Sequence, residues 1–172
     1  MKSGMNTRHT ARQIYSNPIY FLAYGFGSGL APRAPGTAGT LVGVIIFILL
    51  TPVPIWLYWL ITAVLFVIGV FVCGYTARKL GVKDPGAANW DEVVGYLITM
   101  AVMPHALLER GGWLWILLGF VLFRAFDILK PWPIRWFDRN VGGGIGIMLD
   151  DLVAAIPSAV VLYILHLALP AW

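Results

Sequence analysis

The sequence predicts an all-α membrane protein: a polytopic helical bundle of about five transmembrane or half-spanning helices after a short N-terminal interfacial or re-entrant helix. Of the 172 residues, 59% are hydrophobic and only 12% are charged, whereas roughly a quarter of the residues in a soluble domain are charged. The chain also contains several uncharged apolar segments long enough to enter a bilayer. We expect one membrane-embedded domain over residues 1–172, with a polar cytoplasmic tail over residues 1–16.

This composition excludes several classes of protein. Disordered chains, coiled coils and collagen-like chains carry more charge or a biased repeat. The net charge is only +4 and the basic residues are dispersed, so we expect a membrane and no nucleic acid as the partner. Cys73 is the single cysteine, which excludes an intramolecular disulfide.

The individual elements follow from the apolar segments. Residues 18–30 are apolar and Gly-rich but too short to cross a bilayer. Five longer segments cover residues 38–50, 55–77, 93–108, 112–129 and 147–169. At about 1.5 Å per residue, the second, fourth and fifth can cross a core of about 30 Å. The first and third are half-helices or lie where the bilayer is thin. Gly39 and Gly43 have the spacing that lets two helices approach closely, and residues 142–146 are expected to form a turn.

Charge asymmetry predicts the orientation. With the N-terminus in the cytoplasm, the inner regions 1–37, 78–92 and 124–151 contain every Lys and Arg except Arg110, as the positive-inside rule requires. The tryptophans give a second indication, because Trp56, Trp59, Trp113, Trp115 and Trp172 fall at the outer boundary and Trp90, Trp132 and Trp136 at the inner one.

Acidic residues gather at the inner ends of three predicted helices. Asp91 and Glu92 open the third segment, Asp127 closes the fourth, and Asp150 and Asp151 fall in the first turn of the fifth. Converging carboxylates repel one another unless a cation or a basic side chain lies between them. Oxygen ligands without His or Cys suit Mg²⁺ or Mn²⁺ rather than Zn²⁺. The pattern therefore predicts a metal site, ion pairs with Arg or Lys, or both.

Two further motifs indicate phosphate binding. Arg124, Asp127 and Lys130 are spaced i, i+3, i+6, which predicts one helix face carrying phosphate donors beside a carboxylate; a surface salt-bridge ladder is the alternative. Residues 34–40 place glycines and hydroxyls before a helix N-terminus, where unpaired N–H groups favour an anion. Such a loop can also be a simple helix start with Thr37 or Thr40 as N-cap.

The sequence lacks the residues that other classes of phosphatase need for catalysis. None of the three His residues lies beside the inner acids, and Cys73 lies inside a segment without a C-x5-R loop. The D-x-D-x-[TV] stretch of aspartyl-phosphate enzymes is absent. Direct attack by water, assisted by a metal ion, is the chemistry that remains.

Several motifs of this chain together resemble those of the phosphatidylglycerophosphatase A family. The resemblance covers residues 16–155 and rests on the following motifs: Ser16-Asn-Pro, Gly25-Phe-Gly-Ser-Gly-Leu, Pro35-Gly-Thr, Trp90-Asp-Glu with Gly95, Phe123-Arg, Asp127, the run 130–140, Gly146-Ile-Met and Asp150-Asp. The run 130–140 is the most specific of these. Thr40 replaces an expected Ser and keeps the hydroxyl.

The resemblance implies a Mg²⁺-dependent phosphatase of the bacterial inner membrane that converts phosphatidylglycerophosphate to phosphatidylglycerol. It implies a helical fold, because soluble relatives are helical bundles. Together with the residue pattern it predicts that Asp91, Glu92, Asp127, Asp150 and Asp151 hold one or two Mg²⁺ ions. Arg124 and Lys130 would bind the terminal phosphate, and Gly36, Thr37, Gly39 and Thr40 would donate hydrogen bonds to a phosphate. Asp127 and Glu92 are the candidates for the general base.

Three other functions compete with this interpretation. A CDP-alcohol phosphatidyltransferase requires a D-G-x2-A-R…G-x3-D-x3-D pattern, which this chain lacks. A divalent-cation channel or transporter requires acids along the membrane path, but the middle of every segment is uncharged. A non-catalytic assembly factor for lipid enzymes has no need of Arg124, Asp127 and Lys130 beside two acidic pairs.

Overall fold

The computed structural model describes residues 9–103, 111–132 and 134–169, and every element in this part of the chain is helical. The elements are α1 (Ala11–Ser16), α2 (Pro18–Ala23), the 3₁₀ helix η1 (Gly25–Leu30), α3 (Pro35–Leu50), α4 (Ile55–Leu80), α5 (Trp90–Met100), α6 (Gly112–Leu129), α7 (Ile134–Asn140) and α8 (Gly143–Ala168). The predicted all-α class is confirmed.

Among the described residues, α4, α6 and α8 are long and apolar enough to cross a membrane, and α3 is a shorter apolar helix. The chain is therefore a membrane protein, as predicted. The predicted segment 93–108 is only partly helical, because α5 ends at Met100, and its residues 104–108 lie outside the described part. Arg110 and Trp172 lie outside it as well.

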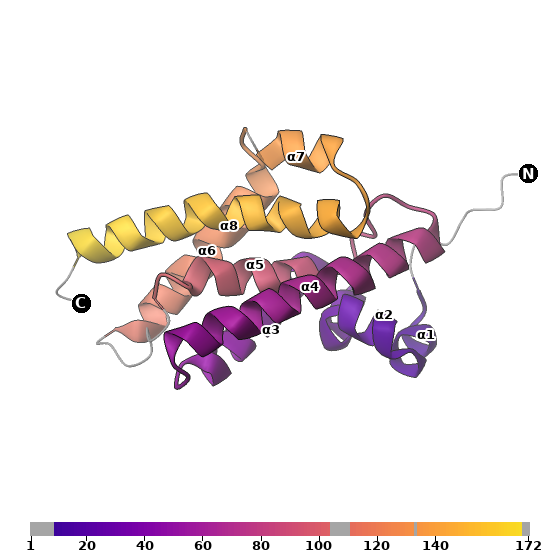
Figure 1. Cartoon of the computed structure of the whole chain (residues 1–172), viewed down its shortest axis with the longest axis horizontal. Helices are drawn as coiled ribbons and strands as arrows, with labels where there is room; N and C mark the ends of the chain where they lie inside the picture. Colours follow the sequence, from indigo (N-terminus) through magenta and orange to yellow (C-terminus); the bar gives the residue numbers. More distant parts are fainter. Residues whose placement is uncertain (1–8, 104–110, 133, 170–172) are drawn as a thin grey trace, which may run out of the picture.

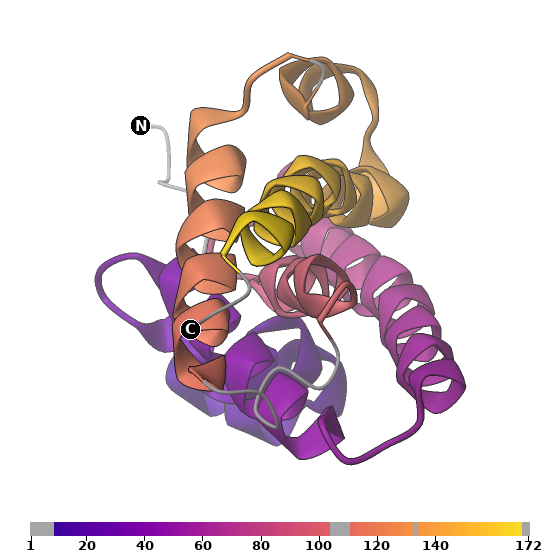
Figure 2. The ribbon, with the colours of Figure 1, turned by 90° about the vertical axis from the view of Figure 1, so that its left-hand side faces the viewer.

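The short helix α5 is the centre of the bundle and packs against α3, α4, α6 and α8. Figure 2 looks along α5 and α8 and shows α6 crossing beside them. Tyr96 and Leu97 of α5 are fully buried in an apolar core that also contains Phe123 of α6 and Leu162 of α8. Because its neighbours enclose it, α5 carries its first turn into the interior of the protein.

Glycines bring helices together at two places. A Cβ at Gly39 would lie 2.7 Å from the carbonyl oxygen of Asn89, just before α5, and a Cβ at Gly43 would lie 3.0 Å from that of Val93 in α5. The predicted close approach of α3 to another helix is therefore confirmed. A Cβ at Gly144 would overlap the Val70 carbonyl of α4. The prediction of a turn over residues 142–146 is wrong, because α8 begins at Gly143. Asp150 and Asp151 consequently lie in the third turn of α8 and not in its first.

The turns and helix ends gather at two opposite ends of the bundle. The α3–α4 turn and the C-terminal end of α8 lie at the left of Figure 1, whereas the end of α4, the start of α8 and the helices α1 and α2 lie toward the right. Residues 18–30 form α2 and η1 rather than one helix, because the backbone has positive φ from Gly25 through Gly27. Trp90 and Trp115 are buried in the protein, so these two tryptophans do not present their rings to a membrane surface.

Candidate active site

Five carboxylates from three helices converge in the interior of the bundle. Asp91 and Glu92 are in the first turn of α5, Asp127 is in the last turn of α6, and Asp150 and Asp151 are in α8. All except Glu92 are buried, and Glu92 is only partly exposed. The predicted convergence is therefore confirmed.

The carboxylates form two groups, each with oxygen atoms that all lie within 4.8 Å of one another. The first group, which we call the α5 triad, contains Asp91, Glu92 and Asp151. The second, the α6 triad, contains Asp127, Asp150 and Asp151. Asp151 belongs to both. Oxygen atoms at these separations can surround a hard divalent cation, for which carboxylates are the preferred ligands.

Buried carboxylate oxygens in this site lack hydrogen-bond partners. Among the described residues, Asp91 Oδ1, Glu92 Oε2 and Asp151 Oδ2 are buried without a partner. Burial raises the pKa of the Asp91 carboxyl well above its ordinary value, and burial raises the pKa of Glu92 to about 7. Leaving such acceptors unpaired is costly, so the donor set fits a bound cation that would satisfy them.

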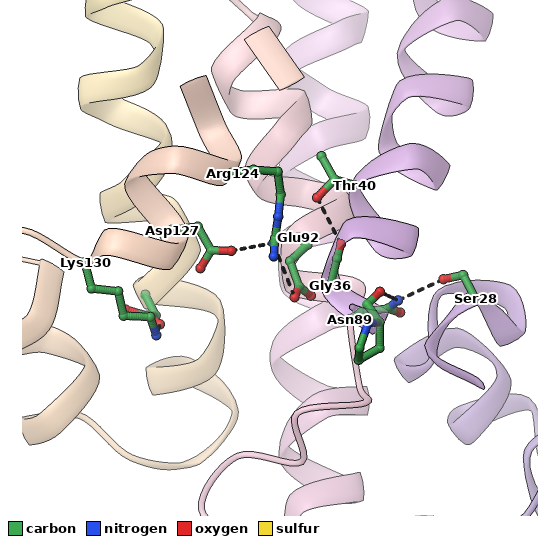
Figure 3. Close-up of polar contacts among 10 residues, drawn as sticks. Ser28, Gly36, Thr40, Asn89, Glu92, Arg124, Asp127 and Lys130 are labelled. Carbon is green, nitrogen blue, oxygen red and sulfur yellow. Dashed lines mark hydrogen bonds and ion pairs between the residues drawn. The ribbon is translucent and has the colours of Figure 1, made fainter. Parts of the chain in front are cut away.

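Arg124 connects two of the acidic helices. Its guanidinium pairs with Asp127 one turn further along α6, and its Nη1 lies 3.7 Å from Glu92 Oε1 of α5. Figure 3 shows the Arg124 side chain between these two carboxylates. The predicted shared face of Arg124 and Asp127 is confirmed.

Lys130 reaches the site by another route than predicted. It is the C-cap of α6 with a φ of 42°, so it does not continue the helical face of Arg124 and Asp127. Pro131 follows it, and the residue before a proline is disfavoured in the helical region. The left-handed turn directs Lys130 to Asp150 of α8, with which its ammonium pairs.

The 36–40 segment borders the acids only at its start. A Cβ at Gly36 would overlap Glu92 Oε1 and lie 3.0 Å from Arg124 Nη1. Thr37 is half-buried in the same turn. The Thr40 hydroxyl is buried and donates to the Gly36 carbonyl at 3.0 Å, and Gly39 packs against Asn89. Neither threonine caps α3, because Ala34 is its N-cap.

Asn89 is a site residue that sequence reasoning missed. Its side-chain amide donates to Ser28 Oγ at 2.9 Å and to the Pro35 carbonyl at 2.7 Å, and Figure 3 shows it between these segments. Its backbone N–H donates to the Ala23 carbonyl at 2.9 Å. An Asn directly before a helix indicates an N-cap, but its side chain makes no cap bond here. The fully buried residue instead connects the start of α5 to η1 and α3 through its side-chain amide and to α2 through its backbone N–H.

The small cavity beside the acids has room for about one water molecule. It measures about 20 Å³ and is lined by Asp91, Asp150, Lys83, Asp84 and the Gly-rich start of α8, among others; a volume above about 10–15 Å³ holds one water. The arrangement therefore combines oxygen ligands for a cation, basic side chains for a phosphate and space for water.

Comparison with known proteins identifies the chain's relatives. The family model for phosphatidylglycerophosphatase A matches residues 21–166. Phosphatidylglycerophosphatase A of Escherichia coli K12 is 49% identical over 153 residues, covering 89% of this chain and 86% of the relative. The Haemophilus influenzae protein of the same name is 47% identical over 148 residues, which cover 86% of this chain and 88% of the relative. No solved structure matches the chain.

Proposed function

Because the chain belongs to the phosphatidylglycerophosphatase A family, we propose how its buried acids and bases carry out that family's reaction. The protein is a phosphomonoesterase that dephosphorylates phosphatidylglycerophosphate to phosphatidylglycerol in phospholipid synthesis. The observation that supports the assignment of residues is the convergence of two carboxylate triads with Arg124 and Lys130.

We assign Mg²⁺ to the carboxylates Asp91, Glu92, Asp127, Asp150 and Asp151. When bound, Mg²⁺ lowers the pKa of a coordinated water and neutralises phosphate oxygens. The donor set supports this assignment, because it contains oxygen atoms alone and several of them are buried without a partner.

Arg124 and Lys130 are assigned to the terminal phosphate. A guanidinium presents paired donors that match phosphate geometry, and an ammonium adds a point charge. Both groups are held by carboxylates of the site, which fixes their positions beside the acids. Gly36 and Thr37, in the first turn of α3, are assigned as backbone donors to the same phosphate.

The reaction breaks the ester bond between phosphorus and the terminal glycerol oxygen. A water oxygen attacks phosphorus, inorganic phosphate is released, and the glycerol oxygen gains a proton to become a hydroxyl. Of the two candidates for accepting the water proton, Glu92 is favoured because its Oε2 has no hydrogen-bond partner in the described part of the chain, whereas Asp127 Oδ2 is occupied by Arg124.

We place the site at the cytoplasmic face of the bacterial inner membrane, with the N-terminus in the cytoplasm. The excess of Lys and Arg in the regions 1–37, 78–92 and 124–151 supports this orientation. The acyl chains then remain in the bilayer while the headgroup reaches the acids, which explains why this phosphatase needs membrane helices.

Phosphate release from phosphatidylglycerophosphate by the purified protein in detergent tests the function. We expect release with Mg²⁺ and none with EDTA. Asp127→Asn should abolish turnover although the protein still inserts, while Lys79→Gln, which removes the charge of an exposed side chain outside the acidic site, should stay active. No release by folded wild-type protein in either condition would favour a transferase or an assembly factor, and normal activity of D127N would refute its assigned role.

A further inference from the structure

Asp151 occupies the position between the two triads. It is 3% exposed, and it supplies an oxygen to both the α5 triad and the α6 triad. Its Oδ2 has no hydrogen-bond partner among the described residues. The ionised form of a buried carboxylate with an unpaired oxygen and carboxylates on both sides is stabilised by positive charge nearby.

The packing of α8 against α5 fixes this position. A Cβ at Gly95 of α5 would lie 3.1 Å from Asp151 Cβ, so the missing side chain at Gly95 lets Asp151 approach α5 closely. Glu92 lies one turn before Gly95 on α5, and Asp127 comes from α6 on the other side. Asp151 is therefore held between carboxylates of two different helices.

The charges of the site are not balanced by its own basic groups. Five carboxylates face Arg124 and Lys130, which pair with Asp127, Glu92 and Asp150. One divalent cation would still leave the site negative before the anionic substrate arrives. Two divalent cations would leave it positive, which favours a phosphate. Each triad also has a buried oxygen without a partner, Asp91 Oδ1 in the first and the shared Asp151 Oδ2 in both.

We propose that the site holds two divalent cations, one in each triad, and that Asp151 is a ligand of both. The proposal deepens the function proposed above by setting the number of ions and naming the residue they share. Two-metal phosphoryl-transfer sites place their ions about 3.5–4 Å apart and stabilise the attacking and the leaving oxygen. Two carboxylate triads with one common member match that arrangement.

Manganese binding by the full-length protein in detergent tests the number of ions. Mn²⁺ is paramagnetic and takes the same oxygen ligands as Mg²⁺, so electron paramagnetic resonance measures both the bound ions and the coupling between them. We expect two Mn²⁺ per chain at saturation and a spin-coupled spectrum. One Mn²⁺ per chain, or two that show no coupling, would overturn the proposal.

Variants separate the shared ligand from the others. Asp151→Asn should remove the spin coupling and lower the affinity for both Mn²⁺ ions. Glu92→Gln and Asp150→Asn each alter one triad, so each should keep one tightly bound Mn²⁺; these two variants carry the test if D151N does not fold. Asp84→Asn changes a carboxylate that lines the cavity but belongs to neither triad, and it should keep the coupled pair. A coupled pair that survives D151N would refute the shared ligand.

The two proposals fail in different ways. If phosphate release requires Mg²⁺ while a single Mn²⁺ binds, the proposed function stands and the two-metal site is wrong. If two coupled Mn²⁺ bind but phosphatidylglycerophosphate is not hydrolysed, the metal site stands and the proposed function is wrong.

Discussion

At the scale of single residues, Asn89 determines where the acids of α5 begin. Its side-chain amide donates hydrogen bonds to Ser28 Oγ and to the Pro35 carbonyl. These bonds fix the start of α5 relative to the 3₁₀ helix and the start of α3. A Cβ at Gly25 or Gly39 would collide with the Asn89 side chain, which explains why small residues surround it. Asn89 is a positioning residue for Asp91 and Glu92, two and three positions further along.

Asn89→Leu tests this role. Leucine has similar size but leaves the Pro35 carbonyl without its side-chain donor, at a cost of about 1–3 kcal/mol in the free energy of unfolding. Because small displacements of catalytic groups cost about 100-fold in rate, we expect kcat to fall by about that factor. KM should rise by a smaller factor, since Arg124 and Lys130 belong to α6 and its C-cap and only Gly36 and Thr37, beside Pro35, depend on Asn89. Steady-state kinetics on folded protein measures both constants.

Ser28→Ala is the matched control, because it removes one acceptor of the Asn89 amide and leaves the bond to Pro35. It should keep kcat close to the wild-type value. If N89L keeps the wild-type kcat per folded molecule, Asn89 has a structural role only.

The sequence predicts some site residues better than others for a physical reason. Asp91, Glu92, Arg124 and Asp127 are placed by helix position, because residues at a helix end or three apart lie together on any helix. Lys130 and Asn89 depend on contacts with distant segments. Pro131 is a local signal that α6 ends at Lys130. The Asp150 carboxylate that Lys130 then reaches in α8 leaves no local signal, and neither does the carbonyl 54 positions earlier that the Asn89 amide bonds.

At the scale of elements, the contact between α5, α6 and α8 depends on Gly95. A Cβ there would lie 2.5 Å from Phe123 Cζ, and Phe123 is fully buried in the core. The aromatic ring has no open space to move into, so any side chain at this position must separate helices that carry the acids.

Gly95→Ala should therefore destabilise the protein and reduce its activity. Overpacking of a core costs about 1–3 kcal/mol, and the accompanying shift of α8 should also weaken the Mn²⁺ coupling. Thermal unfolding in detergent, followed by circular dichroism, measures the first effect. Gly86→Ala is the control, because a Cβ at Gly86 meets nothing within 4 Å; its midpoint should match the wild type. Equal midpoints for G95A and wild type would contradict the close packing.

Helix existence was more predictable than helix boundaries. Apolar length identifies α4, α6 and α8 without any knowledge of their neighbours. The start of α8 was misplaced because glycines suggest a turn when read locally, whereas Gly144 is needed where α8 meets the Val70 carbonyl of α4. Close approach between helices is a property of two segments, which a local pattern does not contain.

At the scale of the whole molecule, the charge pattern and the fold agree on which ends belong together. The positive-inside pattern assigns the end of α4 and the start of α8 to one side of the membrane and the α3–α4 turn to the other. Figure 1 shows the same separation, with the first two at the right and the turn at the left. Because the acids lie at the start of α5 and the end of α6, the orientation of the bundle decides which compartment the site faces.

Cysteine labelling tests this orientation. Cys73 is the single cysteine and is fully buried, so Cys73→Ala gives a background without reactive thiols and should stay active. On this background we introduce Pro52→Cys in the α3–α4 turn, and Lys83→Cys and Gly142→Cys after α4 and before α8; all three positions are exposed. A membrane-impermeant maleimide added to intact spheroplasts should label P52C only, and lysis should expose K83C and G142C. Labelling of K83C and G142C together with protection of P52C in intact spheroplasts would contradict this orientation, because it means either that the bundle is inverted or that α3 does not cross and α4 carries Lys83 to the outside. Labelling of P52C would also show that α3 crosses the membrane although it is shorter than the other apolar helices. Gly36 would then reach the acids from a helix that spans the bilayer.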